Sequence, residues 1–352
     1  MPKHYLLFAS LAYAYTIMRP LQAEIRRRGD VAAWYLEDAC PDLLADDELR
    51  LRTFDEVRRF APIAVFAPGN WIYDFFPGVK VQLFHGYPIK KRIGKTDGHF
   101  RPRGWFDLYC AQGPSSTPTL LALEKKHRYF KVYETGWCRT DDLVAASQAA
   151  NTEKTATRPR AVFVATTFTH GITALRTLLP TIEQLASTHD WQWHITMHPK
   201  LDDADLRARL EDLDRTRANI TFYPITPPPS VMAATDVMLC DSSSIILEYM
   251  MLDRPVVTYR NTAPGPHLID VHDIADVEGA LERAMTRPQE LMDNIHRYTD
   301  YHEAHRDGHN SARVLDAVDD FIAHYQGHLP HKPLNLFRRL KLRWQLRYFH
   351  WR

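Results

Sequence analysis

Residues 237–249 read Val-Met-Leu-Cys-Asp-Ser-Ser-Ser-Ile-Ile-Leu-Glu-Tyr, and this stretch decides the fold class. The apolar run 237–240 predicts a strand that is buried on both faces, as in a parallel sheet. The apolar residues of 244–252 predict a helix, and the polar turn between strand and helix falls at the carboxyl end of the strand. The stretch is therefore one βα unit of an α/β fold.

The same alternation extends to both sides of this unit. In the second half, further strands are predicted at 162–165, 193–197, 220–223 and 256–259. In the first half, strands are predicted at 5–10, 31–36, 63–67, 79–84, 108–111 and 130–133. Helices are predicted over 19–28 and over 172–189, the second with a break or kink at Pro180. This rhythm predicts two largely parallel sheets.

A polar segment divides the chain near its middle. Residues 151–158 read Asn-Thr-Glu-Lys-Thr-Ala-Thr-Arg and carry no apolar anchor, which predicts an interdomain linker. The sequence therefore predicts two Rossmann-like domains, residues 1–150 and 151–325, and a basic tail over 330–352. Such a pair is expected to bind a ligand in the crevice outside the carboxyl ends of the strands.

The composition sets the class of protein. A chain of 352 residues exceeds one ordinary core, and 45% apolar with 25% charged residues is the balance of a soluble globular protein. The net charge of +1 gives no overall field that would attract nucleic acid. The four cysteines are far apart, and no stretch is long and apolar enough for a membrane span. We therefore expect a cytoplasmic protein with reduced thiols.

The run 84–94, Phe-His-Gly-Tyr-Pro-Ile-Lys-Lys-Arg-Ile-Gly, carries the first candidate chemistry. His85 and Gly86 open a tight turn, and the cations Lys90 and Lys91 follow closely. A proton acceptor beside cations suits the activation of a hydroxyl next to a phosphate, since histidine titrates near neutral pH. The alternative is a His-Gly turn in a loop that has no chemistry.

The serines of the stretch 237–249 carry the second candidate chemistry. Ser242, Ser243 and Ser244 precede a helix, whose first N–H groups and dipole favour an anion. The alternative is ordinary capping, because Asp and Ser are preferred N-cap residues. Glu248, one turn into the helix, could accept hydrogen bonds from ribose hydroxyls or be an ordinary surface carboxylate.

Three more positions are candidates. His198 precedes Pro199 at a predicted strand end, which aims its imidazole at the crevice. Arg139 follows a glycine turn and could bind phosphate or pair with Asp141. Arg313 lies in the first turn of a helix after an Asp-Gly turn. His302 and His305 lack a zinc-site pattern, so no metal ligands are expected. Because no clear carboxylate pair stands out, a requirement for Mg²⁺ is left open.

These pieces, in this order, resemble the motifs of the CDP-glycerol glycerophosphotransferase family, which builds or primes teichoic-acid-type chains. The family's W-H-G-T-P-L-K-K-I-G is similar to 84–94, its G-Y-P-R-N-D to 136–141, and its strand followed by H-P to 198–199. Its T-D-Y-S-S-V-x-F-D-Y is similar to 240–249 and its D-G-x-x-S-x-R to 307–313. The likeness covers about residues 60–325. Tyr87, Cys138 and Ser242 depart from the pattern, where the family has Thr, Pro and Tyr.

The resemblance implies a GT-B-like fold, an N-terminal domain that binds the acceptor and a C-terminal domain that binds CDP-glycerol. It implies that His85 is the general base and that His198 contacts the pyrophosphate or protonates the departing CMP. Ser243 and Ser244 would hold phosphate, while Asp241 and Glu248 would orient the nucleotide side. The residues expected to contact substrate are Gly86, Lys90, Lys91, Arg139, Pro199, Asp241, Ser242, Ser243, Ser244, Glu248 and Arg313.

The tail after Leu334 mixes cations with Leu, Phe, Trp and Tyr, with six cations in the last 15 residues. A basic amphipathic helix with aromatic residues suits anionic lipid headgroups, so we favour peripheral association with the inner face of the cell membrane. A lipid-linked glycan acceptor, in teichoic acid or capsule synthesis, would give such an anchor a purpose. The alternative is a helix that packs back on the N-terminal domain.

The sequence alone leaves other functions open. A transferase of the same architecture could use a CMP- or UDP-activated sugar. A nucleotide-sugar 2-epimerase would need no acceptor, and a scaffold protein would bind the nucleotide without turnover.

Overall fold

The structure is a computed structural model that describes residues 1–352 apart from 89–97, 153–157, 170, 199, 226 and 349–352. The N-terminal domain contains a parallel sheet of order β3-β2-β1-β4-β5-β6-β7. Its strands are β1 (His4–Ala9), β2 (Val31–Leu36), β3 (Arg50–Leu51), β4 (Ala64–Ala67), β5 (Val79–Gln82), β6 (Leu108–Ala111) and β7 (Lys131–Glu134). Its helices are α1 (Tyr13–Arg27), α2 (Phe54–Phe60), the 3₁₀ turn η1 (Gly98–Phe100) and α3 (Thr117–His127).

The C-terminal domain contains a second parallel sheet, of order β10-β9-β8-β11-β12-β13. Its strands are β8 (Ala161–Ala165), β9 (Gln192–Thr196), β10 (Ile220–Tyr223), β11 (Val237–Cys240), β12 (Val256–Tyr259) and β13 (Ile269–Val271). Its helices are α5 (Leu175–Thr188), α6 (Ala204–Thr216), α7 (Pro229–Ala233), α8 (Ile245–Met250), η2 (Ile274–Asp276), α9 (Val277–Met285) and α10 (Gln289–His302). Both strand orders reverse beside the first strand, as in Rossmann-like sheets.

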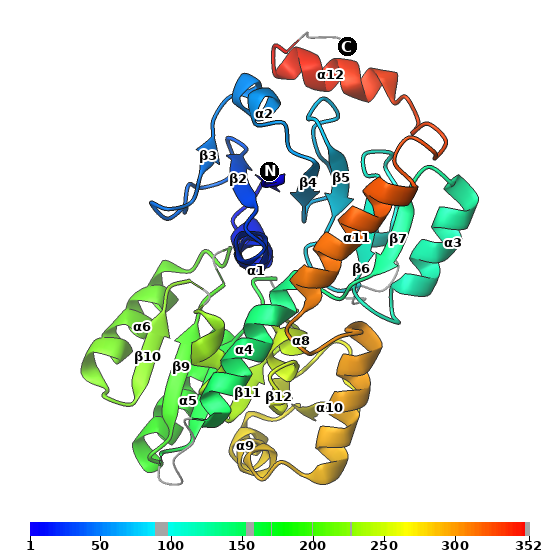
Figure 1. Ribbon diagram of the computed structural model, residues 1–352. Coiled ribbons are helices and arrows are strands. Elements are labelled where there is room, and N and C mark those ends of the chain that lie inside the picture. The colour runs from blue at the N-terminus through cyan, green and yellow to red at the C-terminus, as the bar shows by residue number, and fades with distance from the viewer. Residues whose placement is uncertain (89–97, 153–157, 170, 199, 226, 349–352) are drawn as a thin grey trace.

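Two helices join the domains, as Figure 1 shows. α4 (Cys138–Thr152) leaves the N-terminal domain, and its Leu143 lies in the core of the C-terminal domain. α11 (Asn310–His324) returns, and its Val314 and Phe321 lie in the N-terminal core. Thus α11, which falls within the predicted domain 151–325, packs with the N-terminal core. Apolar periodicity identifies a helix but not which core receives it.

The last helix, α12 (Leu336–Gln345), packs on the N-terminal domain at the end remote from the C-terminal domain (Figure 1). Arg343 and Arg339 lie 3.3 Å and 3.6 Å from the Asp74 carboxylate, and Tyr348 packs against the rings of Phe54 and Phe75. Within the described part of the chain, no helix is both long and apolar enough to cross a bilayer.

The structure differs from the prediction in two helices that contain a proline. The predicted helix over 19–28 begins earlier, at Tyr13, and runs through Pro20. α5 likewise continues through Pro180, where a break or kink was predicted. In both helices the apolar residues on the buried face outweigh the single main-chain hydrogen bond that a proline removes.

Candidate active site

The three serines lie at the carboxyl end of β11 and line a hollow of about 60 Å³ that is open to solvent. The polar residues around it are Ser242, Ser243, Ser244, Asn261, Thr262, His267 and Tyr298. Ser242 Oγ accepts a hydrogen bond from the Thr262 N–H at 2.9 Å, so the hydroxyl proton can donate elsewhere. The His267 ring stacks on Tyr298 at 3.7 Å, and burial lowers the pKa of His267 to about 4. The hollow therefore combines hydroxyl donors with a neutral aromatic wall.

Asp241 lies directly before these serines and is fully buried. Its carboxylate accepts main-chain N–H groups from Thr167 at 2.8 Å, Ala174 at 3.1 Å and Ser242 at 2.6 Å. Burial raises the pKa of Asp241 to about 6. The carboxylate of Asp241, which was expected to orient the nucleotide, thus contacts the protein backbone. Asp241 ties the turn after β8 to the serine turn.

Arg139 and Glu248, both expected to contact substrate, are brought together. Arg139 is buried at the start of α4, and its Nε lies 3.1 Å from Glu248 Oε2 in α8. Its second carboxylate neighbour is Asp142, at 4.0 Å, rather than the Asp141 partner considered from the sequence. The pair joins the carboxyl end of one sheet to that of the other, so the two edges face the same interdomain region.

His85 follows β5 and is exposed. Its ring centroid lies 5.6 Å from that of Tyr13, at the start of α1. Gly86 continues the turn, and Tyr87 packs against the hydrophobic cores of both domains. The turn that carries His85 therefore lies at the domain boundary. Lys90 and Lys91 fall outside the described residues.

His198 follows β9 in the C-terminal domain, and its ring packs against Phe168 at 4.4 Å. The main-chain N–H of Lys200 donates to His198 Nδ1 at 3.0 Å. Because Nδ1 accepts this bond, the ring proton of the neutral imidazole resides on Nε2. His198 can therefore present an N–H donor. Pro199 lies outside the described residues, and the described lining of the serine hollow includes neither His85 nor His198.

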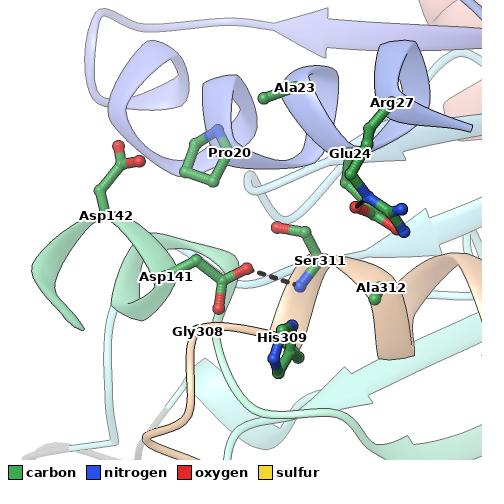
Figure 2. A pocket seen from close by; sticks show the side chains of 10 residues that line it. All are labelled: Pro20, Ala23, Glu24, Arg27, Asp141, Asp142, Gly308, His309, Ser311 and Ala312. Atoms are coloured by element: carbon green, nitrogen blue, oxygen red, sulfur yellow. Dashed lines mark hydrogen bonds and ion pairs between the residues drawn. The ribbon is translucent and has the colours of Figure 1, made fainter. Parts of the chain in front are cut away.

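Arg313 is held away from the serine hollow. Its guanidinium donates to both Asp307 oxygens, at 2.8 Å and 2.5 Å, and this ion pair lowers the pKa of Asp307. Asp141 accepts the Asn310 and Ser311 N–H groups, each at 2.8 Å. Figure 2 shows Asp141 turned toward the Ser311 main chain, beside a hollow between α1, α4 and α11. The motif at 307–313 thus fastens α11 to α4, and Arg313, expected to contact substrate, pairs with Asp307.

No sequence pattern indicates Glu303, which lies just after α10 and is 2% exposed. Its carboxylate accepts hydrogen bonds from the Tyr87 phenol at 2.5 Å and from Thr140 Oγ1 at 3.2 Å. The Trp137 N–H lies 3.2 Å from both carboxylate oxygens. Burial raises the pKa of Glu303 to about 8. A lone glutamate after a helix carries no pattern, and its importance emerges from partners distant in sequence.

One group of described side chains has the spacing of metal ligands. Ligand atoms of His189, Glu278 and Glu282 lie within 4.8 Å of one another. They lie where α5 ends and α9 begins, at the amino end of β9, whereas the serine turn lies at the carboxyl edge of the same sheet. This group therefore belongs to the opposite edge of the domain.

Comparison with known proteins decides the family. The profile of the CDP-glycerol:poly(glycerophosphate) glycerophosphotransferase family matches residues 64–320. The chain belongs to this family. It is accordingly an enzyme that transfers glycerol phosphate from CDP-glycerol to a glycan. No curated protein sequence matches the chain.

Solved structures confirm the fold. The wall teichoic acid polymerase TagF is 14% identical, with a TM-score of 0.63 over 92% of this chain and 90% of that one. A histidine-to-asparagine TagF variant soaked with CDPG is 15% identical, with a TM-score of 0.58 over 93% and 90%. The UDP-GlcNAc 2-epimerase from Neisseria meningitidis bound to UDP-GlcNAc is 14% identical, with a TM-score of 0.56 over 90% and 100%. This glycerophosphotransferase therefore has the expected GT-B-like fold of two Rossmann-like domains.

Proposed function

We propose that the acceptor hydroxyl attacks the β-phosphorus of CDP-glycerol in line, with His85 as general base and CMP as leaving group. The new O–P bond forms as the bond to the bridging oxygen breaks, and the hydroxyl proton passes to the imidazole. The observation that carries this proposal is the position of His85, exposed at the carboxyl end of β5 and at the domain boundary. General base catalysis of this kind contributes about 10²–10⁴-fold.

The donor is proposed to bind on the C-terminal side. Ser243 and Ser244 would donate to phosphate oxygens, since both line the open hollow after β11. Glu248 would orient the nucleotide side, held by its ion pair with Arg139. His198 would hydrogen-bond the pyrophosphate through Nε2 or protonate the departing CMP, which agrees with its Nδ1 accepting from the backbone. Fixed donors aimed at developing charge are the main source of such catalysis.

A direct assay tests the reaction. The purified chain is incubated with CDP-glycerol and a glycerol-phosphate-primed glycan, CMP release is followed, and the product mass is measured. We expect CMP release that depends on acceptor and a product heavier by glycerol phosphate units. Addition of a hexose from a nucleotide sugar, or conversion of a nucleotide sugar without acceptor, would contradict the assignment. Donor binding without CMP release would favour a scaffold.

We further propose that the acceptor is lipid-linked and that α12 holds the enzyme on the inner face of the membrane. α12 turns the cations Arg339 and Arg343 inward, toward Asp74, and apolar side chains outward. Phe337 is 92% exposed and Trp344 is 74% exposed. Exposed cations also lie on this helix, as expected of one that lies in an anionic interface.

Vesicle sedimentation tests the anchor. Burying a Phe or Trp side chain stabilises by about 1.5–3 kcal/mol, so a Phe337→Ser/Trp344→Ser variant should bind anionic vesicles at least about 10-fold more weakly. Tyr301→Ser removes an exposed aromatic side chain from α10 and serves as the matched control. Equal binding by the variant and the wild type would exclude α12 as the anchor. Binding that does not depend on the fraction of anionic lipid would exclude an electrostatic contribution to membrane association.

A further inference from the structure

The backbone on both sides of His85 is attached to one buried network. On the amino side, Phe84 adopts a left-handed conformation, φ 59°, which is strained for a bulky residue. Its carbonyl accepts a hydrogen bond from Trp137 Nε1 at 3.3 Å. On the carboxyl side, the Tyr87 phenol donates to Glu303 at 2.5 Å. His85 is thus anchored at the preceding residue and at the second residue after it.

Both anchors converge on the same carboxylate. The Trp137 N–H lies 3.2 Å from each Glu303 oxygen, so the residue that holds Phe84 is itself held by Glu303. The Tyr87 ring also packs edge-on against Trp137, with centroids 5.1 Å apart. The conformation of the His85 turn therefore depends on the carboxylate of Glu303, which lies just after the C-terminal end of α10.

The network lies where the chain passes between the domains. Thr140 in α4 donates to Glu303 Oε2, and Asn310 at the start of α11 donates to Oε1, both at 3.2 Å. Packing around the carboxylate is tight, because a Cβ at Gly136 would lie 2.4 Å from Glu303 Oε1. The group is therefore held from several sides and has little freedom to move.

We propose that Glu303 is a positioning residue for the transfer reaction, which holds the backbone on both sides of His85 through Tyr87 and Trp137 and so fixes the imidazole at the acceptor hydroxyl. This inference rests on the proposed role of His85 as general base.

The test combines two mild variants with a double-mutant cycle. Tyr87→Phe removes one hydroxyl, and Glu303→Gln retains the volume of the side chain. An error of about 1 Å in a catalytic group can cost roughly 10²-fold, so we expect each variant to lower kcat about 10- to 100-fold. The KM and Kd for CDP-glycerol should stay within about 2-fold, because neither Tyr87 nor Glu303 lines the serine hollow to which the donor is assigned.

The cycle separates positioning from general damage. Adding Tyr87→Phe to His85→Ala should cause no further loss of the residual rate, since the tyrosine acts through an imidazole that is absent. Tyr133→Phe serves as the control. It removes the hydroxyl of a tyrosine on edge strand β7 that is hydrogen-bonded to Asp320, and it should leave kcat unchanged. Thermal unfolding of each variant reports whether it is folded.

The outcomes distinguish the two proposals. Wild-type turnover in His85→Ala would overturn the general base and the positioning role together. A large loss in His85→Ala with full kcat in a folded Tyr87→Phe would overturn the positioning role alone. An equal loss from Tyr87→Phe with and without His85 would also overturn it, because the effect would then be structural.

Discussion

Replacing Asp241 by Asn should change stability in a way that depends on pH. Thr167 and Ser242 donate to one carboxylate oxygen, and Ala174 donates to the other. An asparagine can keep the first two bonds, but its NH₂ group then faces the Ala174 N–H. Leaving a buried donor unpaired costs about 1–3 kcal/mol, so the variant should be about 2 kcal/mol less stable than the protein with a neutral Asp241.

Ionisation of the buried Asp241 carboxylate also lowers the stability of the folded state. Burial raises the pKa of Asp241 from 3.8 to about 6, so the folded state holds the proton more tightly than the unfolded state does. Stability from this group is therefore present below pH 3.8 and is lost as the pH rises through 6. A shift of about two pKa units corresponds to roughly 3 kcal/mol. The penalty of Asp241→Asn should then vanish or change sign by about pH 8.

Urea unfolding followed by circular dichroism measures this at about pH 4.5, 6 and 8 for both proteins. We expect the free-energy difference between wild type and variant to fall by about 2 kcal/mol across the range. Asp46→Asn, an exposed carboxylate, controls for the change in net charge. A difference that is constant with pH, or one that grows toward pH 8, would refute the burial argument.

Two further predictions concern catalysis and donor binding. His85→Ala should lower turnover about 10²–10⁴-fold in initial-rate assays of CMP release without altering the melting temperature, and a wild-type rate would remove His85 from the mechanism. Ser243→Ala/Ser244→Ala should weaken CDP-glycerol binding about 10-fold or more by calorimetry, at about 1 kcal/mol for each hydrogen bond, while unchanged affinity would move the phosphate site elsewhere.

The sheets could be predicted because buried parallel strands are short apolar runs. Strands β2, β6, β10, β11 and β12 have the predicted bounds, and all four cysteines are buried. The two-residue β3 carries no periodic signal. α1 begins before the predicted start at Arg19 and runs through Pro20, and α5 continues through Pro180, because packing on the sheet supports both helices.

The candidate site was harder to predict, since the motifs identify residues but not their partners. Arg139 pairs with Glu248 across the domains, and Arg313 pairs with Asp307. Glu303 shows no pattern in the sequence, although it binds residues from three of the motifs. These contacts join segments up to 216 residues apart, and only the folded arrangement brings them together.

The central claim is that the serine turn after β11 and the imidazole after β5 act on one diphosphate. A crystal structure of the His85→Ala variant with CDP-glycerol tests it most directly. The account predicts phosphate oxygens within hydrogen-bond distance of Ser243 or Ser244, with the β-phosphorus facing residue 85 across the domain boundary. A diphosphate bound away from the serines, or turned from residue 85 with protein between them, would contradict the account.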